Sequence, residues 1–240
     1  MLHTLLDLIY PVRCPICGEI IVPKKQMICE GCRERLNYIS EPRCKSCSKP
    51  IEVEEKEYCS DCERKKFHYD KGYAVWVYND AMRNSIAAYK YSSKKEYSNF
   101  YTHEMLRLYG GILRKLSFDA IIPVPIHRSK YLERGYNQAE LLAKVIGREL
   151  KVPIYTKLLI RNKKTLPQKE LSDKERLKNL AEAFEISNQI LKVKLKSIKK
   201  VLLVDDIYTT GSTVEACSNV LKSYGIDQVY FIVLCIGKGY

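Results

Sequence analysis

One stretch of thirteen residues, Val201–Thr213 (VLLVDDIYTTGST), combines the residue types that would hold a phosphorylated sugar. Its aliphatic start predicts a buried parallel strand, and Asp205 and Asp206 follow at the carboxyl end, where open α/β sheets bind ligands. Adjacent carboxylates can accept hydrogen bonds from the two hydroxyls of a ribose cis-diol. The loop that follows opens a predicted helix, whose N-terminus favours an anion. This loop consists of Thr209, Thr210, Gly211, Ser212 and Thr213.

The same stretch resembles the phosphoribosyl-pyrophosphate (PRPP) signature of type I phosphoribosyltransferases, in which two acids precede a hydrophobic-x-Thr-Thr-Gly-x-Thr run. The resemblance implies that Asp205 and Asp206 are the catalytic pair and hold the ribose of PRPP, bound with Mg²⁺. The 5′-phosphate would lie in the loop 209–213, where Gly211 has no Cβ to obstruct it. The alternative is an acidic pair at a strand end before an ordinary capped helix.

A second anionic group fits the turn that follows the predicted buried strand AIIPVP, at residues 120–125. In type I phosphoribosyltransferases the loop at this place holds the pyrophosphate. By that resemblance the pyrophosphate would be lined by Pro125, Ile126, His127 and Arg128. The alternative for His127 is a simple turn residue.

Eight of the ten cysteines lie before residue 63 and form four Cys-x2-Cys pairs. A shift of thirty residues lays the first two pairs on the last two, so the segment contains two copies of one unit. Two such pairs facing each other complete the tetrahedral four-sulfur shell of a closed structural zinc site. We therefore expect two structural zinc ions. Their ligands would be Cys14, Cys17, Cys29, Cys32, Cys44, Cys47, Cys59 and Cys62.

The sequence leaves the pairing of these cysteines open. Sequential sets, 14–32 and 44–62, are favoured because each repeat would then be self-sufficient, and interleaved sets are the alternative. Disulfides are disfavoured in a reducing cytosol, and an iron–sulfur cluster fits the paired spacing less well than zinc. The remaining two cysteines, Cys217 and Cys235, fall in apolar patterns and are predicted core residues.

The formal net charge of +13 lies in the second part of the chain, because residues 1–68 hold 12 Lys/Arg and 11 Asp/Glu. A basic lobe suits anionic partners such as nucleic acid or phosphorylated substrates, although it can also serve solubility alone. No apolar run reaches the ~20 residues of a membrane span. The first ten residues predict a short amphipathic helix rather than a signal peptide. We expect a cytoplasmic protein that does not insert into a membrane.

Beyond a charged linker at 63–66, strand and helix patterns alternate, which predicts an α/β fold with a mostly parallel sheet flanked by helices. Strands are expected at 73–78, 120–125, 154–160, 201–204 and 229–236, and helices at about 80–91, 97–116, 138–150 and 212–224. The predicted domains are a zinc-binding double ribbon with a short N-terminal helix at 1–66 and a phosphoribosyltransferase-like domain at 67–240.

Two further segments are candidates for contacts with nucleic acid or for a lid. The run RGYNQ at 134–138 starts a predicted helix just after the expected pyrophosphate loop. The long segment 161–184 has seven Lys/Arg between 161 and 178 and a capping-box pattern at Ser172 to Glu175, which is typical of a functional flap or a disordered loop. A lid would protect an oxocarbenium-like intermediate from water. The candidates are Lys90, Arg134, Asn137, Gln138, Lys163, Lys164, Gln168 and Arg176.

In combination these motifs resemble the ComF family, specifically ComFC-type competence proteins. The motifs are the paired cysteine knuckles, Lys90-Tyr91 after a helix, RGYNQAELLA, the T-L-P-Q to A-F stretch and the PRPP signature, and they span nearly the whole chain in order. The resemblance implies a double zinc ribbon fused to a phosphoribosyltransferase-like domain. It also implies a role in natural transformation, in which the protein handles incoming single-stranded DNA at the inner face of the membrane with a helicase-like partner.

Two functions fit these residues. One is a competence protein of DNA uptake that binds a PRPP-type phosphosugar with Mg²⁺ and grips single-stranded DNA through its basic lobe and exposed aromatic side chains. The alternative is an active phosphoribosyltransferase, which would transfer a pentosyl group to a nitrogenous acceptor in nucleotide metabolism or salvage by positioning and charge stabilisation. The two can coexist. A transcriptional regulator that reuses the pocket is a weaker alternative, because no helix-turn-helix pattern is present.

Overall fold

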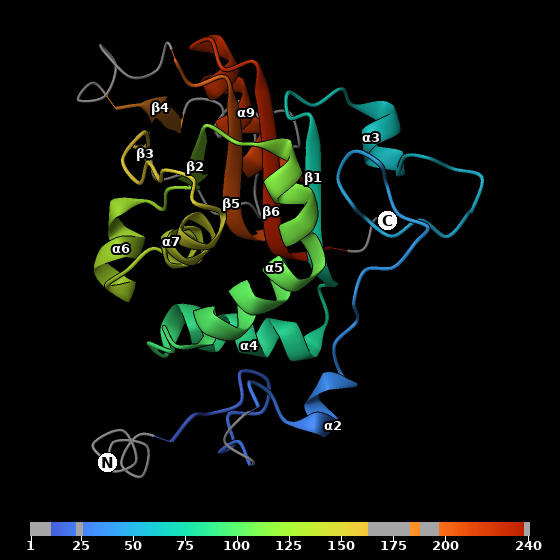
Figure 1. Ribbon diagram of the computed structural model, residues 1–240, viewed down its shortest axis with the longest axis vertical. Helices are drawn as coiled ribbons and strands as arrows, with labels where there is room; N and C mark the ends of the chain where they lie inside the picture. Colours follow the sequence, from blue (N-terminus) through green and yellow to red (C-terminus); the bar gives the residue numbers. More distant parts are fainter. Residues whose placement is uncertain (1–10, 23–25, 163–182, 188–196, 238–240) are drawn as a thin grey trace.

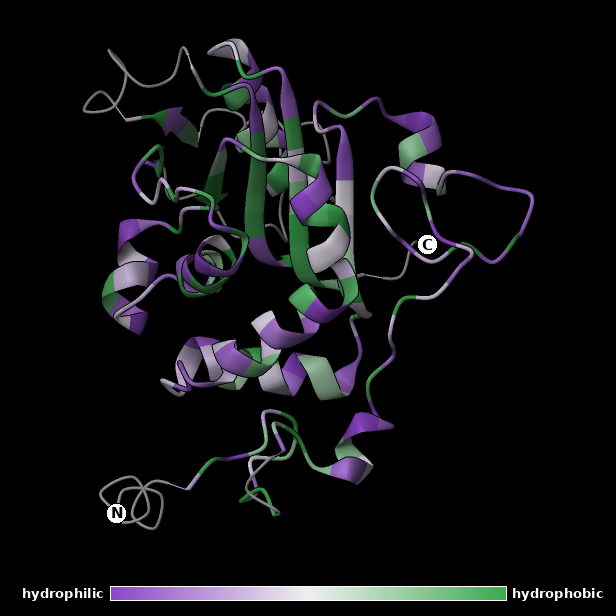
Figure 2. Ribbon diagram, in the orientation of Figure 1, coloured by the Kyte–Doolittle hydropathy of each residue, from purple (hydrophilic) through white to green (hydrophobic). Residues whose placement is uncertain are grey.

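A four-stranded parallel sheet forms the centre of the protein, in the strand order β1-β6-β5-β2 (Figure 1). The computed structural model describes residues 11–22, 26–162, 183–187 and 197–237. The strands are β1 (Lys71–Val77), β2 (Ala120–Pro123), β5 (Lys200–Tyr208) and β6 (Gln228–Ile236). The two central strands are almost continuously apolar (Figure 2), as expected of parallel strands covered on both faces.

Helices cover both faces of this sheet and create two apolar clusters. Because successive side chains of β5 point to opposite faces, Leu202 and Val204 lie in one cluster and Val201 and Leu203 in the other. The first cluster packs under α4 (Asp80–Tyr91), α5 (Tyr97–Leu116) and α7 (Gln138–Leu150). The second packs under α9 (Ser212–Ser223) and a separate antiparallel pair, β3 (Leu159–Arg161) and β4 (Phe184–Ile186).

The two cysteine repeats lie at different places on this body (Figure 1). The first contains α2 (Glu30–Arg33), and its Ile21 and Ile28 belong to the cluster under α4 and α5. The second contains α3 (Ser60–Arg64) and contributes Ile51 to the opposite cluster. The chain between them pairs with the outer edge of β1, where Ile39 N donates to Val75 O over 3.0 Å. That segment covers a sheet edge that would otherwise expose its hydrogen-bonding groups.

Most elements begin and end close to their predicted bounds. The α7 helix has the predicted bounds, and Asn79 caps α4 by accepting a hydrogen bond from Met82 N at 2.9 Å. The prediction of a strand over residues 154–160 is wrong, because only Leu159–Arg161 is a strand and it pairs with β4 outside the main sheet. Ile154 makes a single parallel bridge to Ile121, and the chain then turns away between Tyr155 and Leu158.

Two other segments near the expected site also differ from prediction. The β5 strand continues to Tyr208 because its parallel pairing with β6 extends to Ile236, so both aspartates lie inside the strand rather than after it. Residues 128–134 form a short helix, α6 (Arg128–Arg134), which the sequence analysis did not predict. His127 caps it, and Gly135 ends it with a φ of +76°. The predicted N-terminal helix and the basic segment 163–182 lie outside the described residues.

A buried carboxylate ties the first repeat to the body. Glu104 of α5, with a side chain 1% exposed, accepts hydrogen bonds from Tyr38 Oη at 2.7 Å and from Arg107 Nη2 at 2.6 Å. Burial alone would raise the pKa of Glu104, but these donors outweigh it and hold the pKa below its usual value. Arg33 of α2 lies 4.0 Å from the same carboxylate. Among the described helices, none is long and apolar enough to cross a membrane.

We predict that Glu104→Ala lowers the free energy of unfolding by about 2–4 kcal/mol, because it leaves buried donors without their acceptor. Urea unfolding at neutral pH in the presence of zinc measures the change. Glu149→Ala removes an exposed glutamate from α7 and serves as the control, with an expected change of at most about 0.5 kcal/mol. Equal effects of the two substitutions would show that the buried carboxylate does not anchor the first repeat.

Candidate active site and metal centres

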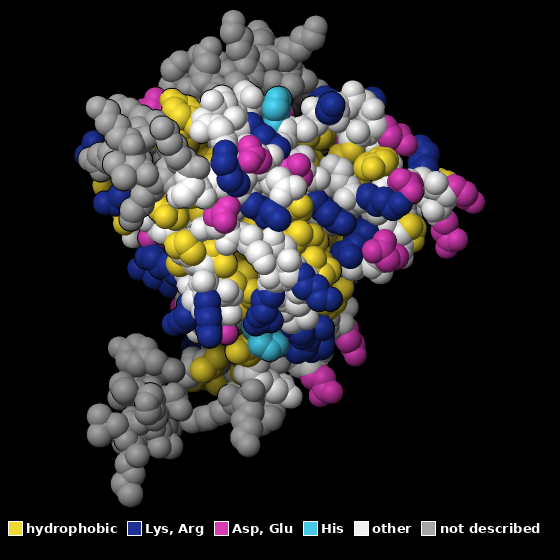
Figure 3. Space-filling view, turned by 45° about the horizontal axis from the view of Figure 1, so that its top comes forward, with side chains coloured by type: hydrophobic (Ala, Val, Ile, Leu, Met, Phe, Trp, Pro, Cys, Tyr) yellow, Lys and Arg dark blue, Asp and Glu magenta, His cyan; other side chains and the backbone are white. Residues whose placement is uncertain are grey.

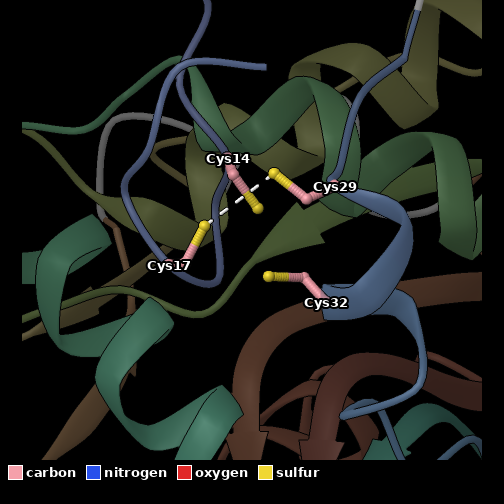
Figure 4. A group of neighbouring side chains, drawn as sticks. All are labelled: Cys14, Cys17, Cys29 and Cys32. Carbon is pink, nitrogen blue, oxygen red and sulfur yellow. Dashed lines mark hydrogen bonds between the residues drawn. The ribbon is translucent and has the colours of Figure 1, made fainter. Parts of the chain in front are cut away.

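The eight cysteines of the repeats form two groups of four, and within each group the Sγ atoms all lie within 4.8 Å of one another. The first group is Cys14, Cys17, Cys29 and Cys32, and the second is Cys44, Cys47, Cys59 and Cys62. Figure 4 shows the first group, with two cysteines on the hairpin facing two at the start of α2. The sequential pairing is therefore confirmed, and all ten cysteines are free of disulfides. Four converging sulfur ligands fit closed structural zinc sites.

The two hairpins repeat the same backbone hydrogen bonds. Cys14 N donates to Glu19 O and Cys44 N donates to Lys49 O, both over 2.8 Å. In each hairpin the residue after the second cysteine has a positive φ, +78° at Gly18 and +70° at Ser48. The thirty-residue repeat in the sequence is thus a repeat in structure, and each copy presents its thiols without help from the other.

A cavity of about 620 Å³ lies at the carboxyl ends of β2 and β5. It brings together predicted site residues from segments far apart in the chain, because parallel strands place their carboxyl ends at one edge. Eleven of the predicted residues line it. They are Lys90, Pro125, Ile126, His127, Arg134, Asn137, Gln138, Asp205, Asp206, Thr209 and Thr213.

The remaining predicted residues do not line the cavity or are not described. Thr210 Oγ1 and Ser212 Oγ lie 2.8 Å apart and share a hydrogen bond within the loop. Gly211 turns the loop with a φ of +79°, and Arg128 opens α6. Lys163, Lys164, Gln168 and Arg176 lie outside the described residues.

The carboxylates differ in their partners although they are adjacent. Asp206 forms an ion pair with Lys90 Nζ of α4, while Asp205 Oδ1 accepts a hydrogen bond from Asp206 N at 2.8 Å. Burial, and next the charge of Asp206, raise the pKa of Asp205 well above its usual value. The same ion pair outweighs burial at Lys90 and raises its pKa, so the ammonium stays charged. Lys90 thus pairs directly with Asp206, while Asp205 is a carboxyl buried beside a like charge.

The opposite wall of the cavity offers donors at the start of α7. Asn137 Oδ1 caps this helix by accepting from Ala139 N at 3.1 Å. Gln138 is only 2% exposed, and its Oε1 accepts from Arg134 Nη1 at 2.8 Å. Its amide Nε2 is buried with no hydrogen-bond partner in the described part of the chain. An unused buried donor at a helix N-terminus is suited to an anionic ligand.

Six lining residues were missed by the sequence analysis: Val124, Ser129, Lys130, Ala139, Arg161 and Ile207. Arg161 could have been found as the first basic residue of the segment 161–184, but its approach to β5 follows from the β3–β4 pair, which the sequence did not predict. Lys130 lies in α6, a helix that the sequence analysis did not predict. An apolar part of the wall is formed by Val124, Ala139 and Ile207. Apolar residues of this kind are common in any core, so the sequence does not mark them as part of a site.

We predict about two zinc ions per chain, measured by elemental analysis after gel filtration. Cys17→Ala with Cys29→Ala should retain about one zinc, because both residues belong to the first group. Cys29→Ala with Cys62→Ala should lose both, since it breaks one ligand set in each group. The reverse pattern would indicate ligand sets shared between the repeats.

Two family models match the chain. Residues 5–63 match a double zinc ribbon domain, and residues 136–239 match a phosphoribosyl transferase domain. A purine phosphoribosyltransferase from Pyrococcus horikoshii is similar in structure, with a TM-score of 0.36 and 17% identity over 57% of this chain and 73% of that chain.

Curated relatives are similar over most of their length. Competence protein F of Haemophilus influenzae is 29% identical over 90% of this chain and 93% of its own. Competence protein ComFC of Bacillus subtilis is 27% identical over 83% and 80%, and DNA utilization protein YhgH of Escherichia coli (strain K12) is 26% identical over 94% and 97%. The chain thus combines a double zinc ribbon domain with a phosphoribosyl transferase domain, and over most of its length it is similar to competence proteins.

Proposed function

We propose that this protein binds PRPP, or a closely related phosphosugar, together with Mg²⁺, and that it acts in competence. The cavity at the end of β5 carries the proposal, because it combines a buried and a half-buried carboxylate, a hydroxyl-bearing loop and a cationic wall. Asp205 and Asp206 would bind the ribose hydroxyls. The raised pKa of Asp205 supports this, since diol hydrogens or a divalent cation would stabilise its charged form.

The two anionic parts of the ligand would occupy two helix N-termini. The 5′-phosphate would lie against Thr209 and Thr213, where the loop enters α9. The pyrophosphate would lie between residues 125–127 and the start of α7, where it would accept a hydrogen bond from Gln138 Nε2. The pyrophosphate would then meet Gln138 Nε2, which has no other described partner, and the 5′-phosphate would meet the favourable dipole of α9.

Pentosyl transfer to a nitrogenous acceptor is a second candidate function. This function is favoured by the cationic side chains that line the cavity, which include Lys130, Arg134 and Arg161. Such cations would stabilise the charge that develops on a leaving pyrophosphate. The apolar wall at Val124, Ala139 and Ile207 would accommodate part of an acceptor. Asp205 and Asp206 would then orient the ribose for attack at its anomeric carbon.

Single-stranded DNA is the second ligand that we propose. Lys and Arg side chains are spread over the face in Figure 3, consistent with the net charge of +13. Near the cavity, Tyr91 is 58% exposed, and Arg134 lies 4.8 Å from its ring centre. An exposed ring beside cations suits base stacking with phosphate contacts. The names of the curated relatives, competence proteins and a DNA utilization protein, agree with a DNA ligand.

The family resemblance extends this proposal to the setting of the protein. It would work in the cytoplasm at the inner face of the membrane, beside a helicase-like partner. Residues 1–66 would form the zinc-binding part, and residues 67–240 the phosphosugar-binding part. Lys163, Lys164, Gln168 and Arg176 of the basic segment 161–184 lie outside the described residues and stay predicted candidates for contacts with nucleic acid or for a lid.

We predict that the protein binds PRPP in the presence of Mg²⁺ and that Asp205→Asn with Asp206→Asn weakens binding at least about 10-fold. The reason is the loss of charged acceptors, each worth about 1.5–3 kcal/mol. Isothermal titration calorimetry measures the affinity. Asp227→Asn removes an exposed carboxylate beyond α9 and should leave binding unchanged. Absence of binding by the unaltered chain, or equal affinity in the double variant, would contradict the proposal.

We predict that a fluorescent single-stranded oligonucleotide binds the protein and that its affinity falls steeply between 50 and 200 mM salt, because bound cations are released from the phosphates. Fluorescence anisotropy measures both. Tyr91→Ala should weaken binding by about 1–3 kcal/mol. Tyr224→Ala, at the residue after α9, removes another exposed ring, at 47% exposure, and should not weaken binding. Binding that is absent, or insensitive to both salt and Tyr91, would count against a DNA interface here.

A further inference from the structure

A continuous line of buried contacts joins the second cysteine group to the loop 209–213, hereafter the phosphate loop. Cys62 Sγ lies 3.8 Å from Tyr69 Oη, and Tyr69 Oη lies 2.7 Å from Tyr208 Oη. Both tyrosines are almost fully buried, at 4% and 2% exposure. Tyr208 is the last residue of β5, so the line ends directly beneath the phosphate loop.

The phosphate loop rests on the phenol of Tyr208. Gly211 has a φ of +79°, and a Cβ at this position would lie 2.3 Å from Tyr208 Oη. The backbone of the loop and the hydroxyl of Tyr208 are therefore in contact with no room for a side chain between them. A displacement of the phenol would have to displace the loop.

Tyr208 is itself held in place from the second repeat. Its ring stacks on Phe231 with centres 5.0 Å apart and planes 5° apart. Lys49 Nζ, from the second cysteine hairpin, lies 5.9 Å from the ring centre and is fixed by Asp61 Oδ2 at 2.7 Å. Lys49 is 3% exposed, so this ammonium is buried against the ring rather than loose in solvent. Tyr208 thus contacts Lys49 in the hairpin of the second repeat and Tyr69, which follows its last cysteine.

A second contact joins the residues after the second repeat to the start of α9. His68 N donates to Glu215 Oε2 over 2.8 Å, and the His68 imidazole pairs with the other oxygen of this carboxylate. Glu215 lies in the first turn of α9, and its own N–H donates to Gly211 O over 2.8 Å. Residues 68 and 69, which follow the second repeat, therefore fix the start of the helix as well as the support of the loop.

The first cysteine group has a different environment. Its buried members, Cys14 and Cys32, pack in the apolar cluster under α4 and α5, whereas Tyr208 and Val214 belong to the other cluster with Cys47 and Cys59. The two groups have the same cysteine spacing and each has its own set of four thiols, but they support different parts of the molecule.

We propose that Tyr69 and Tyr208 are positioning residues of the phosphate loop and that the second zinc centre sets their position. A zinc-bound thiolate can only accept, so Tyr69 donates to Cys62 and accepts from Tyr208, which fixes the direction of both hydrogen bonds. The loop is thereby held in one anion-binding conformation. Occupancy of the second centre, and not of the first, governs the affinity for the phosphate of the sugar. This inference rests on the proposed phosphosugar function.

The test compares Tyr69→Phe with Tyr38→Phe in the full-length, zinc-loaded chain. Each substitution removes one hydrogen-bonded phenolic hydroxyl that lies next to a cysteine repeat. Tyr69 bonds to Cys62 and Tyr208, whereas Tyr38 bonds to Glu104 of α5. Three quantities are measured: zinc per chain, hydrogen exchange of the amides of residues 209–215, and affinity for ribose 5-phosphate with Mg²⁺. For Tyr69→Phe we expect unchanged zinc, faster exchange and a 3- to 10-fold lower affinity, about the effect of one buried hydrogen bond. For Tyr38→Phe we expect exchange and affinity as in the unaltered chain.

Unchanged loop exchange and affinity in Tyr69→Phe would overturn the inference, as would an equal effect of Tyr38→Phe. If Tyr69→Phe also loses a zinc ion, Tyr208→Phe decides, because Tyr208 has no hydrogen bond to a cysteine among the described contacts. Faster loop exchange in that variant supports the coupling, and unchanged exchange overturns it. The exchange measurement needs no ligand. Failure of the unaltered chain to bind ribose 5-phosphate would therefore count against the proposed function alone.

Discussion

The parallel pairing of β5 with β6 on one side and β2 on the other is the constraint on which the candidate site depends. The pairing with β2 ends at Val204, and the pairing with β6 continues to Tyr208. Asp205 and Asp206 are consequently held within a rigid strand, at the edge where the segment after β2 also emerges. Adjacent carboxylates in such a place repel each other and lose hydration, and Lys90 forms its ion pair with Asp206 rather than with Asp205. This arrangement is costly unless a ligand uses it, which is why the site is informative about function.

The cysteine repeats depend on a second constraint, which is the binding of metal. A segment with so few apolar residues has little core of its own and would depend on metal to fold. Each repeat contributes side chains to a different one of the two apolar clusters, and the chain between them covers the edge of β1. The metal centres therefore do more than stabilise an appended module. The first supports the helices that supply Lys90, and the second lies under the strand end that supplies the phosphate loop.

The sequence was informative wherever one local pattern determined the structure. Cysteine spacing favoured the two sequential ligand sets that the structure brings together, and the apolar periodicity of 138–150 predicted α7 with its bounds. The prediction failed at residues 154–160, where the pattern suggested one strand, because the chain turns at 155–158 and then enters a separate antiparallel pair. The contribution of Arg161 depends on that pair, and the line from Cys62 to Tyr208 joins residues 146 positions apart. Contacts of this kind arise from packing and leave no local pattern.

The most direct test of the account is the hydrogen-exchange footprint of Mg²⁺ and PRPP on the intact, zinc-loaded protein. We predict slower exchange in two separate regions, residues 205–215 and residues 125–139, because the ligand would bridge the strand end and the start of α7. Peptides from the first cysteine repeat should not change. Protection confined to one region, protection elsewhere, or no protection at saturating ligand would contradict a phosphosugar site at the end of β5.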